Sequence, residues 1–288
     1  MDIQYLDDQP NLEFENFKSA IRTIGKQVKK ETLILIETTV PPGTCEKVVV
    51  PVLRDELNKR NIKLDNIHIA HSYERVMPGK DYLKSITDYW RVFSGYSETA
   101  ANICEEFLNN IINTQKFPLT RLSSTIASET AKVMENTYRA VNIAFIEEWR
   151  KFCSKNDLDL EKILSTIRQR KTHNNIMRSG IGVGGYCLTK DPLFAKASSK
   201  QVLHEKFDFP LSSKAVEVNQ KMTFDVMSEI KNKFNKKILG KKVLLIGVSY
   251  REDTNDTRYS PAEGVFNFFR KMSCKLNFYD PIVNYWEY

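Results

Sequence analysis

The sequence predicts an α/β protein in which a parallel, doubly wound sheet comes first, an all-helical segment second and a further strand–helix–strand unit last. Three observations support this order. Short apolar runs alternate with helical patterns up to residue 122, which is typical of parallel sheets. Helical periodicity alone fills most of residues 123–235, and strand character returns in residues 236–288.

The first segment opens on a predicted helix, because Phe14, Phe17, Ile21, Ile24 and Val28 fall at helical spacing. Next comes an apolar run that leads into two prolines and a glycine, as a buried strand does where it enters a loop. The remaining elements follow by the same criteria. We predict strands at 33–36, 67–70 and 91–94, and helices at 14–28, 45–60 and 100–112.

Long helical patterns and two short strands divide the rest of the chain. We predict helices at 124–155, 160–169 and 212–234, then strands at 242–247 and 275–279 on either side of a helix that begins near Pro261. Two strands with open edges rarely stand alone. We therefore expect the chain to be a fragment of a larger three-part protein.

The composition is that of a soluble globular protein. Of its 288 residues, 41% are hydrophobic and 27% are charged. The apolar runs are too short to span a bilayer, and the first residues show no secretory signal, so we expect a cytoplasmic protein without membrane contact. The net charge of +7 is spread over helices that also carry acids, which favours local anion sites over nucleic-acid binding.

Cysteine and histidine usage argues against two kinds of site. The five cysteines are an odd number without a Cys-x-x-Cys pair, and the four histidines lack metal-ligand spacing. We therefore expect neither a disulfide framework nor a metal site. In a reducing compartment, the question is whether one of the thiols is reactive.

The densest signal is a glycine-rich run, GIGVGGYCLTKDP, at residues 180–192. Its glycines fit G-x-G-x-x-G, but no strand precedes them, which disfavours a dinucleotide-binding loop. We predict that they let the backbone wrap closely around a ligand and present Cys187 at its edge. A helical start would stack Lys190 and Asp191 beside this thiol, and a nearby ammonium favours the nucleophilic thiolate. The alternative is a buried structural cysteine in a glycine-rich turn.

Within this run, GGYCLTKD at residues 184–191 resembles the nucleophile motif of the UDP-glucose/GDP-mannose dehydrogenase family. That family oxidises a sugar C6 alcohol to a carboxylate with two NAD. The resemblance extends from about Leu12 over almost all of the chain, in the family's order of motifs, and implies a Rossmann-like fold in two partial domains. It implies the C-terminal part of an NAD-binding domain at 1–122, a helical dimerisation and substrate domain at 123–235, and the truncated start of a UDP-binding domain at 236–288.

A helix motif supplies the next part of the implied site. ETAKVMENTYRAVNIAF at residues 129–145 resembles the family's dimerisation helix. By that resemblance Lys132 stabilises the oxyanion at C6, and Asn136 positions a water or the same oxygen. Taken alone, the two residues could equally belong to a solvated helical face. The resemblance also implies a homodimer formed through residues 131–149.

Two loops after predicted strands complete this part of the site. ETTVPPGT at residues 37–44 is similar to a family signature in which the position of Thr39 touches NAD and an ordered water. SYERVMPG at residues 72–79 resembles the family's Pro-Glu-Arg loop, with Tyr73 in place of the usual proline. Glu74 is then the carboxylate that manages water during thioester hydrolysis. Without the resemblance, it is an ordinary loop acid.

The run from residue 244 to residue 261 resembles the start of the family's UDP-binding domain. It places Arg251 where a basic residue contacts substrate and Arg258 where an arginine reaches NAD. The alternative is a structural arginine that pairs with Asp253 or Asp256.

The resemblance assigns three sets of residues. Catalytic roles fall to Cys187, Lys132, Asn136, Asp191, Glu74 and Thr39. Substrate contacts fall to Glu74, Arg75, Val76, Met77, Lys132, Asn136, Arg178, Gly184 and Arg251. NAD contacts fall to Thr39, Lys190 and Arg258.

The implied reaction has two hydride transfers with a covalent step between them. Cys187 captures the C6 aldehyde as a thiohemiacetal, a thioester follows, and water releases the uronate. Asp191 and Asn136 orient Lys132 or water. The motif details lean toward UDP-N-acetylhexosamines as substrates, with UDP-glucose and GDP-mannose also open, and the family implies a role in polysaccharide biosynthesis.

The sequence departs from the family at the NAD site. The family's first strand and its Gly-x-Gly-x-x-Gly turn would lie upstream of residue 1. We therefore expect the isolated chain to bind NAD poorly and to turn over little. The alternative function is an inactive remnant that serves only as a dimerisation or nucleotide-sugar-binding module.

Overall fold

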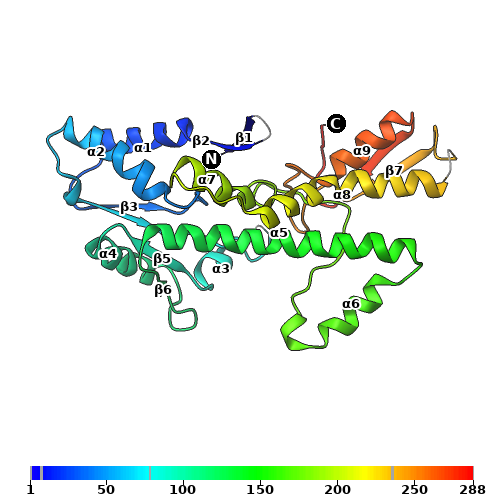
Figure 1. Ribbon diagram of the computed structural model, residues 1–288, viewed down its shortest axis with the longest axis horizontal. Coiled ribbons are helices and arrows are strands. Elements are labelled where there is room, and N and C mark those ends of the chain that lie inside the picture. The colour runs from blue at the N-terminus through cyan, green and yellow to red at the C-terminus, as the bar shows by residue number, and fades with distance from the viewer. Residues whose placement is uncertain (1, 7–8, 78, 235–236, 288) are drawn as a thin grey trace. The chain divides into compact units, whose positions relative to one another are not determined.

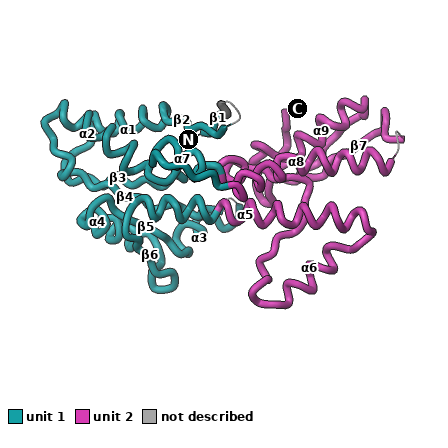
Figure 2. Tube along the Cα trace, in the orientation of Figure 1, with its two compact units in different colours: residues 1–135, 193–209 teal, residues 136–192, 210–288 magenta. Residues whose placement is uncertain are grey.

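The computed structural model describes residues 2–6, 9–77, 79–234 and 237–287. The chain forms two compact units (Figure 2). Unit 1 contains residues 1–135 and 193–209, and unit 2 contains residues 136–192 and 210–288. Helix α5 (Thr125–Lys155) contributes residues to both units. The division into three domains that the sequence suggests stays a prediction.

Unit 1 begins with a hairpin that the sequence did not indicate. β1 (Asp2–Leu6) and β2 (Gln9–Glu13) pair antiparallel, so the expectation of a helix as first element was wrong. β2 packs on α7 (Phe194–Gln201), where Leu12 and Phe194 are buried in one apolar cluster. The sequence of β2, QPNLE, has low strand propensity, and tertiary contacts of this kind override such propensities.

The main sheet of unit 1 has the order β3–β4–β5–β6. Its strands are β3 (Thr32–Ile36), β4 (Ile67–His71), β5 (Val92–Gly95) and β6 (Thr120–Arg121). The pairs β3–β4 and β5–β6 are parallel, as predicted, but β4 and β5 are antiparallel. A parallel neighbour needs a crossover back to the other end of the sheet. The segment between β4 and β5 instead carries only the short helix α3 (Tyr82–Thr87).

Helices cover both faces of this sheet (Figure 1). These helices are α1 (Glu15–Gln27) and α2 (Val50–Asn58) on one face, with the π-helical turn Cys45–Val49 before α2, and α4 (Glu98–Asn109) on the other. Side chains of β3 alternate between the two layers, as the pleat requires. Ile34 and Ile36 join the cluster of α1 and α2, whereas Leu33 and Leu35 pack against the cluster of α4. The α/β fold class is therefore confirmed.

Unit 2 is mostly helical and ends in a second strand–helix–strand unit. Besides the rest of α5, its elements are α6 (Leu160–Arg168), α8 (Pro210–Phe234), β7 (Lys242–Ile246), α9 (Pro261–Lys271) and β8 (Lys275–Tyr279). β7 and β8 pair in parallel. Each predicted element of this region is present, with bounds that differ by at most two residues.

An ionic network around the buried Glu147 ties α5 to α8 in unit 2. Arg150 lies 2.7 Å from the carboxylate of Glu147 and 2.9 Å from that of Glu229. Glu147 is fully buried, and Lys151 forms a further ion pair with Asp225. Because a buried carboxylate is strongly destabilising without a partner, this network fixes how the two helices pack.

Candidate active site

In unit 1, three chain segments meet at the carboxyl edge of β3 and β4, where α/β sheets bind their ligands. The loops after β3 and β4 leave the sheet there. Because β5 runs antiparallel to β4, the segment before β5 arrives at the same edge. Arg91 in that segment lies 2.8 Å from the Glu37 carboxylate, and the Ser72 hydroxyl donates to the carbonyl of Val92 at 3.1 Å. The sequence did not single out Arg91, because a parallel β5 would place it at the opposite edge.

The loop after β3, which carries the half-buried Thr39, is anchored to α5 by Glu129. The two carboxylate oxygens of Glu129 accept the backbone N–H groups of Gly43 at 2.6 Å and Cys45 at 2.8 Å. Gly43 has φ +87, and a Cβ there would lie 2.8 Å from Leu203, so this turn requires glycine. Glu129 is fully buried, and burial raises the pKa of its carboxyl group to about 7.

The loop after β4 is anchored to the same helix by Lys132. Its ammonium donates to the backbone carbonyl of Glu74 at 3.0 Å and lies 5.4 Å from the centre of the Tyr73 ring. Only 8% of Lys132 is exposed. The alternative of a solvated helical face is therefore wrong for Lys132. The Glu74 carboxylate, which is half-buried, accepts the N–H of Val76.

Arg75 stabilises the loop after β4 through several hydrogen bonds. Its guanidinium lies 3.0 Å from the carboxylate of Glu135 and donates to the carbonyl of Trp90 at 2.8 Å and to the hydroxyl of Tyr73 at 3.1 Å. A side chain with this many partners positions the loop. Met77, in the same loop, is exposed, and its N–H donates to the hydroxyl of Ser85.

A row of three buried, hydrogen-bonded polar side chains lies close to the two loops. His71 Nδ1 is 2.7 Å from the Ser128 hydroxyl, which is 2.7 Å from the hydroxyl of Ser94. All three residues are fully buried, and His71 Nε2 has no hydrogen-bond partner among the described residues. Burial lowers the pKa of His71 to about 4. The sequence offered no signal for this row of polar side chains, because a lone histidine in a strand is usually a core residue.

In unit 2, Cys187 is exposed, and the other cysteines are not. Cys45, Cys104 and Cys153 are buried, and Cys274 is half-buried with its thiol donating to the carbonyl of Ile238 at 3.1 Å. Burial raises the pKa of the Cys45 thiol well above its usual value, and it raises that of Cys104 to about 12. The alternative of a buried structural cysteine is therefore wrong for Cys187.

A helical turn links Cys187 to a buried carboxylate, whereas the stacking of Lys190 and Asp191 beside the thiol stays a prediction. The N–H of Asp191 donates to the carbonyl of Cys187 at 2.9 Å. The Asp191 side chain is fully buried and is held by the Asn136 amide at 2.8 Å and the Lys190 ammonium at 2.9 Å. Lys190 also lies 4.3 Å from the centre of the Tyr186 ring. Unit 2 thus brings four predicted site residues into one connected group.

Three of the four glycines before Cys187 lie where an added Cβ would meet other residues of unit 2. A Cβ at Gly184 would lie 2.7 Å from the Tyr250 side chain. Gly185, with φ +79, would place its Cβ 2.8 Å from the same ring, and Gly182 would meet Thr223 at 2.5 Å. Three of these glycines thus let the Cys187 segment pack closely on neighbouring residues, and their wrapping around a ligand stays a prediction. The described residues before Gly180, from residue 174 on, contain no strand, which agrees with rejecting a dinucleotide loop here.

The predicted arginine contacts differ in their surroundings. Arg178 is exposed and lies 3.7 Å from the carboxylate of Glu161. Arg251 is half-buried. Arg258 is exposed and pairs with Asp256 at 2.7 Å, one of the two alternatives for this region. Its contact with NAD stays a prediction.

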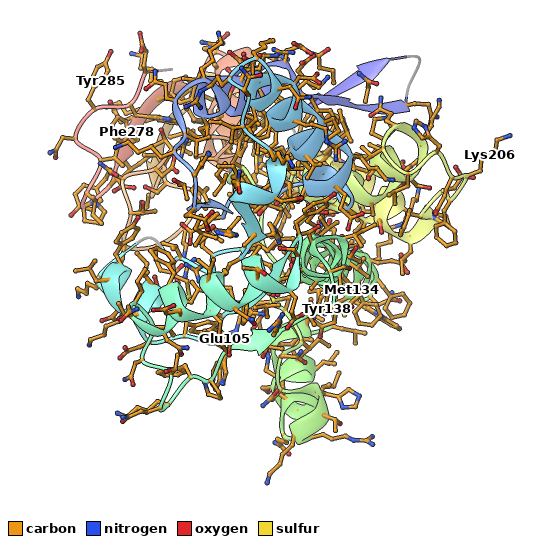
Figure 3. The ribbon with its side chains drawn as sticks, turned by 90° about the vertical axis from the view of Figure 1, so that its left-hand side faces the viewer. Glu105, Met134, Tyr138, Lys206, Phe278 and Tyr285 are labelled. Atoms are coloured by element: carbon orange, nitrogen blue, oxygen red, sulfur yellow. The ribbon has the colours of Figure 1, made fainter. Side chains whose placement is uncertain are left out.

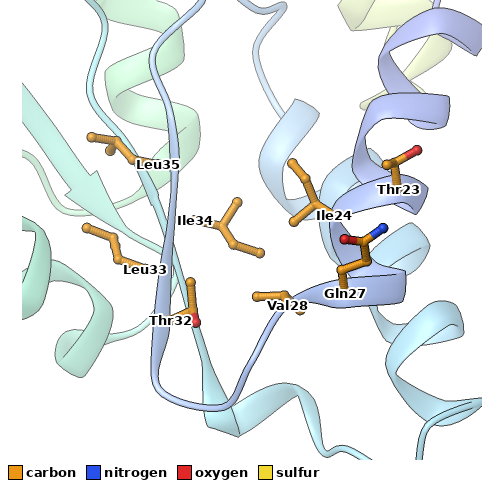
Figure 4. Close-up of a pocket in the computed structure, with 8 residues that line it drawn as sticks. All are labelled: Thr23, Ile24, Gln27, Val28, Thr32, Leu33, Ile34 and Leu35. Atoms are coloured by element: carbon orange, nitrogen blue, oxygen red, sulfur yellow. The ribbon is translucent and has the colours of Figure 1, made fainter.

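A groove of about 520 Å³ lies between α1 and the open edge of β3. Figure 4 shows Ile24, Val28 and Ile34 directed into the space between the helix and the strand. None of the predicted site residues lines it. In the part of the chain that the structure describes, no helix has the length and apolar content to cross a membrane. The residues that the structure describes also form no cluster of acidic, histidine and cysteine side chains able to hold a metal ion.

Comparison with known proteins gives three consecutive matches to one family. Residues 6–115 match the NAD binding domain of the UDP-glucose/GDP-mannose dehydrogenase family. Residues 126–221 match its central domain, and residues 244–288 match its UDP binding domain. The matches occur in the same order as the motifs identified in the sequence.

Individual relatives cover nearly all of this chain. It is 32% identical over 281 residues to UDP-N-acetyl-D-mannosamine dehydrogenase of Pyrococcus horikoshii, covering 96% of this chain and 63% of that protein. The solved structure of the UDP-D-ManNAc dehydrogenase from Pyrococcus horikoshii superposes with a TM-score of 0.80 at 30% identity, covering 98% of this chain and 64% of the other. An NDP-N-acetyl-D-galactosaminuronic acid dehydrogenase from Methanosarcina mazei gives a TM-score of 0.81 at 25% identity, covering 100% and 62%. The chain therefore spans less than two thirds of the length of these relatives.

Proposed function

The chain belongs to the UDP-glucose/GDP-mannose dehydrogenase family, and from this premise we propose that it supplies the nucleophile and the oxyanion partner of an NAD-dependent nucleotide-sugar 6-dehydrogenase. The observation that carries the proposal is the exposed Cys187 one helical turn before the buried Asp191. Asn136 and Lys190 hold that carboxylate. An accessible thiol one turn before an ordered polar group suits a covalent mechanism.

The chemistry proposed for these residues begins with the C6 alcohol. In each of the two oxidations, bound NAD would supply the hydride acceptor for C6, and the hydroxyl proton would pass to water. After the first oxidation, the Cys187 thiolate attacks the aldehyde carbon, a C–S bond forms, and the carbonyl electron pair moves to oxygen and takes up a proton. Lys132 stabilises the charge on that oxygen. After the second oxidation, water attacks the thioester, and the C–S bond breaks to release the carboxylate and the thiol.

The remaining site residues hold or orient groups. Glu74 takes a proton from the attacking water, and Asn136 and Asp191 fix the water and the oxyanion partner. Thr39 contacts NAD at the carboxyl edge of β3, where its half-buried side chain and the anchored loop fit such a ligand. Lys190 and Arg258 are the other proposed NAD contacts. Arg258 would exchange its pairing with Asp256 for a cofactor phosphate.

The substrate proposed is a UDP-N-acetylhexosamine. The motif details that lean toward this class are supported by the Pyrococcus horikoshii relative, which is named as a UDP-N-acetyl-D-mannosamine dehydrogenase. The proposed substrate contacts are Glu74, Arg75, Val76, Met77, Lys132, Asn136, Arg178, Gly184 and Arg251. Arg75 acts through the loop that it braces, because its guanidinium is already bound by protein groups.

The first test measures thiol reactivity and turnover together. Iodoacetamide should add one group per chain at Cys187, and Cys187→Ser should remove that adduct, whereas the half-buried Cys274→Ser should keep it. NADH formation is then followed with a panel of UDP-sugars. The turnover of the isolated chain, which we expect to be low, should be abolished in Cys187→Ala and preserved in Cys274→Ala. Turnover that persists in Cys187→Ala contradicts the proposal.

The second test asks whether Lys132 and Cys187 address one carbonyl carbon. In Lys132→Cys, a short bifunctional thiol reagent such as dibromobimane should join the new thiol to Cys187. The control Thr130→Cys, at an exposed position of the same helix, should react without that cross-link. Absence of the cross-link in Lys132→Cys means that the two groups do not share a site.

We also propose that the chain forms a homodimer through α5. Met134 and Tyr138, which lie one turn apart and are labelled in Figure 3, are 67% and 54% exposed. Phe145 and Trp149 continue the exposed apolar side chains along α5 and line a mostly apolar groove of about 440 Å³ against α6. An apolar surface of this kind marks an interaction site, and a second copy would bury it.

Light scattering tests the dimer. Phe145→Glu and Trp149→Glu should yield monomers, whereas Glu148→Gln, at an exposed polar position between them, should leave the mass unchanged. A wild-type monomer would contradict this assignment. The same exposed apolar surface also supports the alternative function, an inactive dimerisation module. A dimer that forms no NADH with any sugar would favour that alternative.

A further inference from the structure

The first turns of α5 bind both loops at the carboxyl edge of the main sheet. Glu129 holds the loop after β3 through the N–H groups of Gly43 and Cys45. Lys132, three residues later on the helix, holds the loop after β4 through the carbonyl of Glu74. Residues three apart lie on the same helical face. One short stretch of helix therefore sets the positions of two loops that the proposed function uses.

The Glu129 contacts require both carboxylate oxygens as acceptors. Oε2 accepts from Gly43 and Oε1 accepts from Cys45. An ionised carboxylate offers acceptors at both oxygens, whereas a protonated one carries a hydrogen on one of them. Protonation of Glu129 therefore turns one of the two oxygens into a donor that faces another donor, and weakens the bond on that side.

Several titratable groups surround Glu129. The π-helical turn after the loop contributes the Cys45 thiol and the Glu46 carboxylate, and the negative charge of Glu46 favours the protonated form of Glu129. From β4, His71 bonds the neighbouring Ser128. Burial is the largest influence, and it raises the pKa of Glu129 to about 7 although the hydrogen bonds from Cys45 and Gly43 lower it. The two states of the carboxyl group are therefore both populated near neutral pH.

We propose that Glu129 is a positioning residue whose ionised carboxylate holds the loop carrying Thr39 in place beside Lys132. The loop is anchored by two charge-assisted hydrogen bonds in the ionised state and loosened in the protonated state. Its consequence for NAD affinity rests on the proposed function, because Thr39 is one of the proposed NAD contacts. The anchoring itself does not depend on that function.

Hydrogen exchange tests the anchoring directly. The amides of residues 43–46 are followed by mass spectrometry at about pH 5.5 and about pH 8.5, on either side of the Glu129 pKa of about 7, after correction for intrinsic exchange. Protection in the wild type should rise with pH, by roughly tenfold for the loss or gain of one such bond. Glu129→Gln has one acceptor oxygen at every pH and should show low protection that does not change. Glu148→Gln, the same change at an exposed site of the helix, should behave as the wild type does.

The outcomes separate this inference from the proposed function. Protection that stays constant with pH in the wild type, or still rises with pH in Glu129→Gln, overturns the inference. If Glu129→Gln does not fold, the wild-type profile alone decides. The dissociation constant for NAD, from calorimetry at about pH 8.5, should be roughly tenfold higher in Glu129→Gln. If neither protein binds NAD while exchange follows the expected pattern, the proposed function fails and the positioning role stands.

Discussion

The buried His71 makes a sharp prediction about stability in acid. Its ring is fully buried, and its Nε2 has no partner among the described residues. The substitution His71→Asn keeps a polar group near Ser128, the partner of Nδ1, and removes the titrating ring. The new residue is smaller, so the variant loses some stability at every pH. The diagnostic quantity is the change of that loss with pH.

The magnitude follows from the pKa of His71, which burial lowers from 6.5 to about 4. Between these values the unfolded chain takes up a proton that the folded chain does not, so His71 destabilises the fold as the pH falls. At roughly 1.4 kcal/mol for each pH unit, the total is about 3 kcal/mol. His71→Asn should therefore gain about 3 kcal/mol relative to the wild type between pH 7 and pH 4.

The wild type alone will not reveal this dependence, because Glu129 acts in the opposite direction. Its pKa is raised from 4.5 to about 7, so its contribution to stability is present below pH 4.5 and is lost as the pH rises to about 7. Between pH 4.5 and pH 6.5 the two slopes nearly cancel. Glu129→Gln should expose the His71 slope, so that its stability falls in acid relative to the wild type, and His71→Asn should expose the slope of Glu129.

Urea denaturation followed by circular dichroism, at pH values from 4 to 7.5, measures these differences. The control is His204→Asn, because His204 is exposed, and it should follow the wild-type dependence. A difference between His71→Asn and the wild type that is constant over this range would refute the reasoning, because it would mean that the His71 ring reaches water or a partner in the folded state.

Two further predictions concern packing. Arg150→Ala removes the closest partner of the buried Glu147 carboxylate. Urea denaturation should therefore show a free energy of unfolding that is lower by roughly 3 kcal/mol, and a loss below about 1 kcal/mol would contradict this role of Arg150. Gly185→Ala and Gly240→Ala both force alanine into a left-handed conformation, with φ +79 and φ +69, but only at Gly185 does the new Cβ meet another residue, the Tyr250 ring. Thermal unfolding should show that Gly185→Ala costs at least about 1 kcal/mol more, and equal losses would show that the ring moves aside freely.

Much of the fold is readable from local patterns. β7 and β8 each have half-buried and exposed residues in alternation, and α8 has helical periodicity over many turns. Such signals depend on neighbours along the chain and need no knowledge of tertiary partners. The direction of β5 had no such signal. Whether a strand pairs in parallel or antiparallel depends on where its connection goes, and the short α3 in that connection left no clear pattern.

Some residues of the candidate site can likewise be identified from local sequence patterns, whereas others become visible only in the fold. Its motifs located Cys187, Lys132 and Asp191 because glycines and charged residues at set spacings are visible in sequence. Glu129 lies inside one of those motifs, yet an acid on a helix is usually solvated, and only the fold shows its two backbone partners. The same holds for Tyr250, whose ring determines which residues can stand before Cys187.

The reversed direction of β5 has a consequence for how this family member could diversify. Residues 79–91, which lead into β5, reach the edge of the sheet where Glu37 and Ser72 lie. They are not part of the crossover that joins β3 to β4. Insertions or exchanges in this segment can therefore reshape the rim of the site while both the crossover and its buried layer of helices stay as they are. New ligand preferences can thus evolve in a stretch of chain that lies outside the β3–β4 crossover.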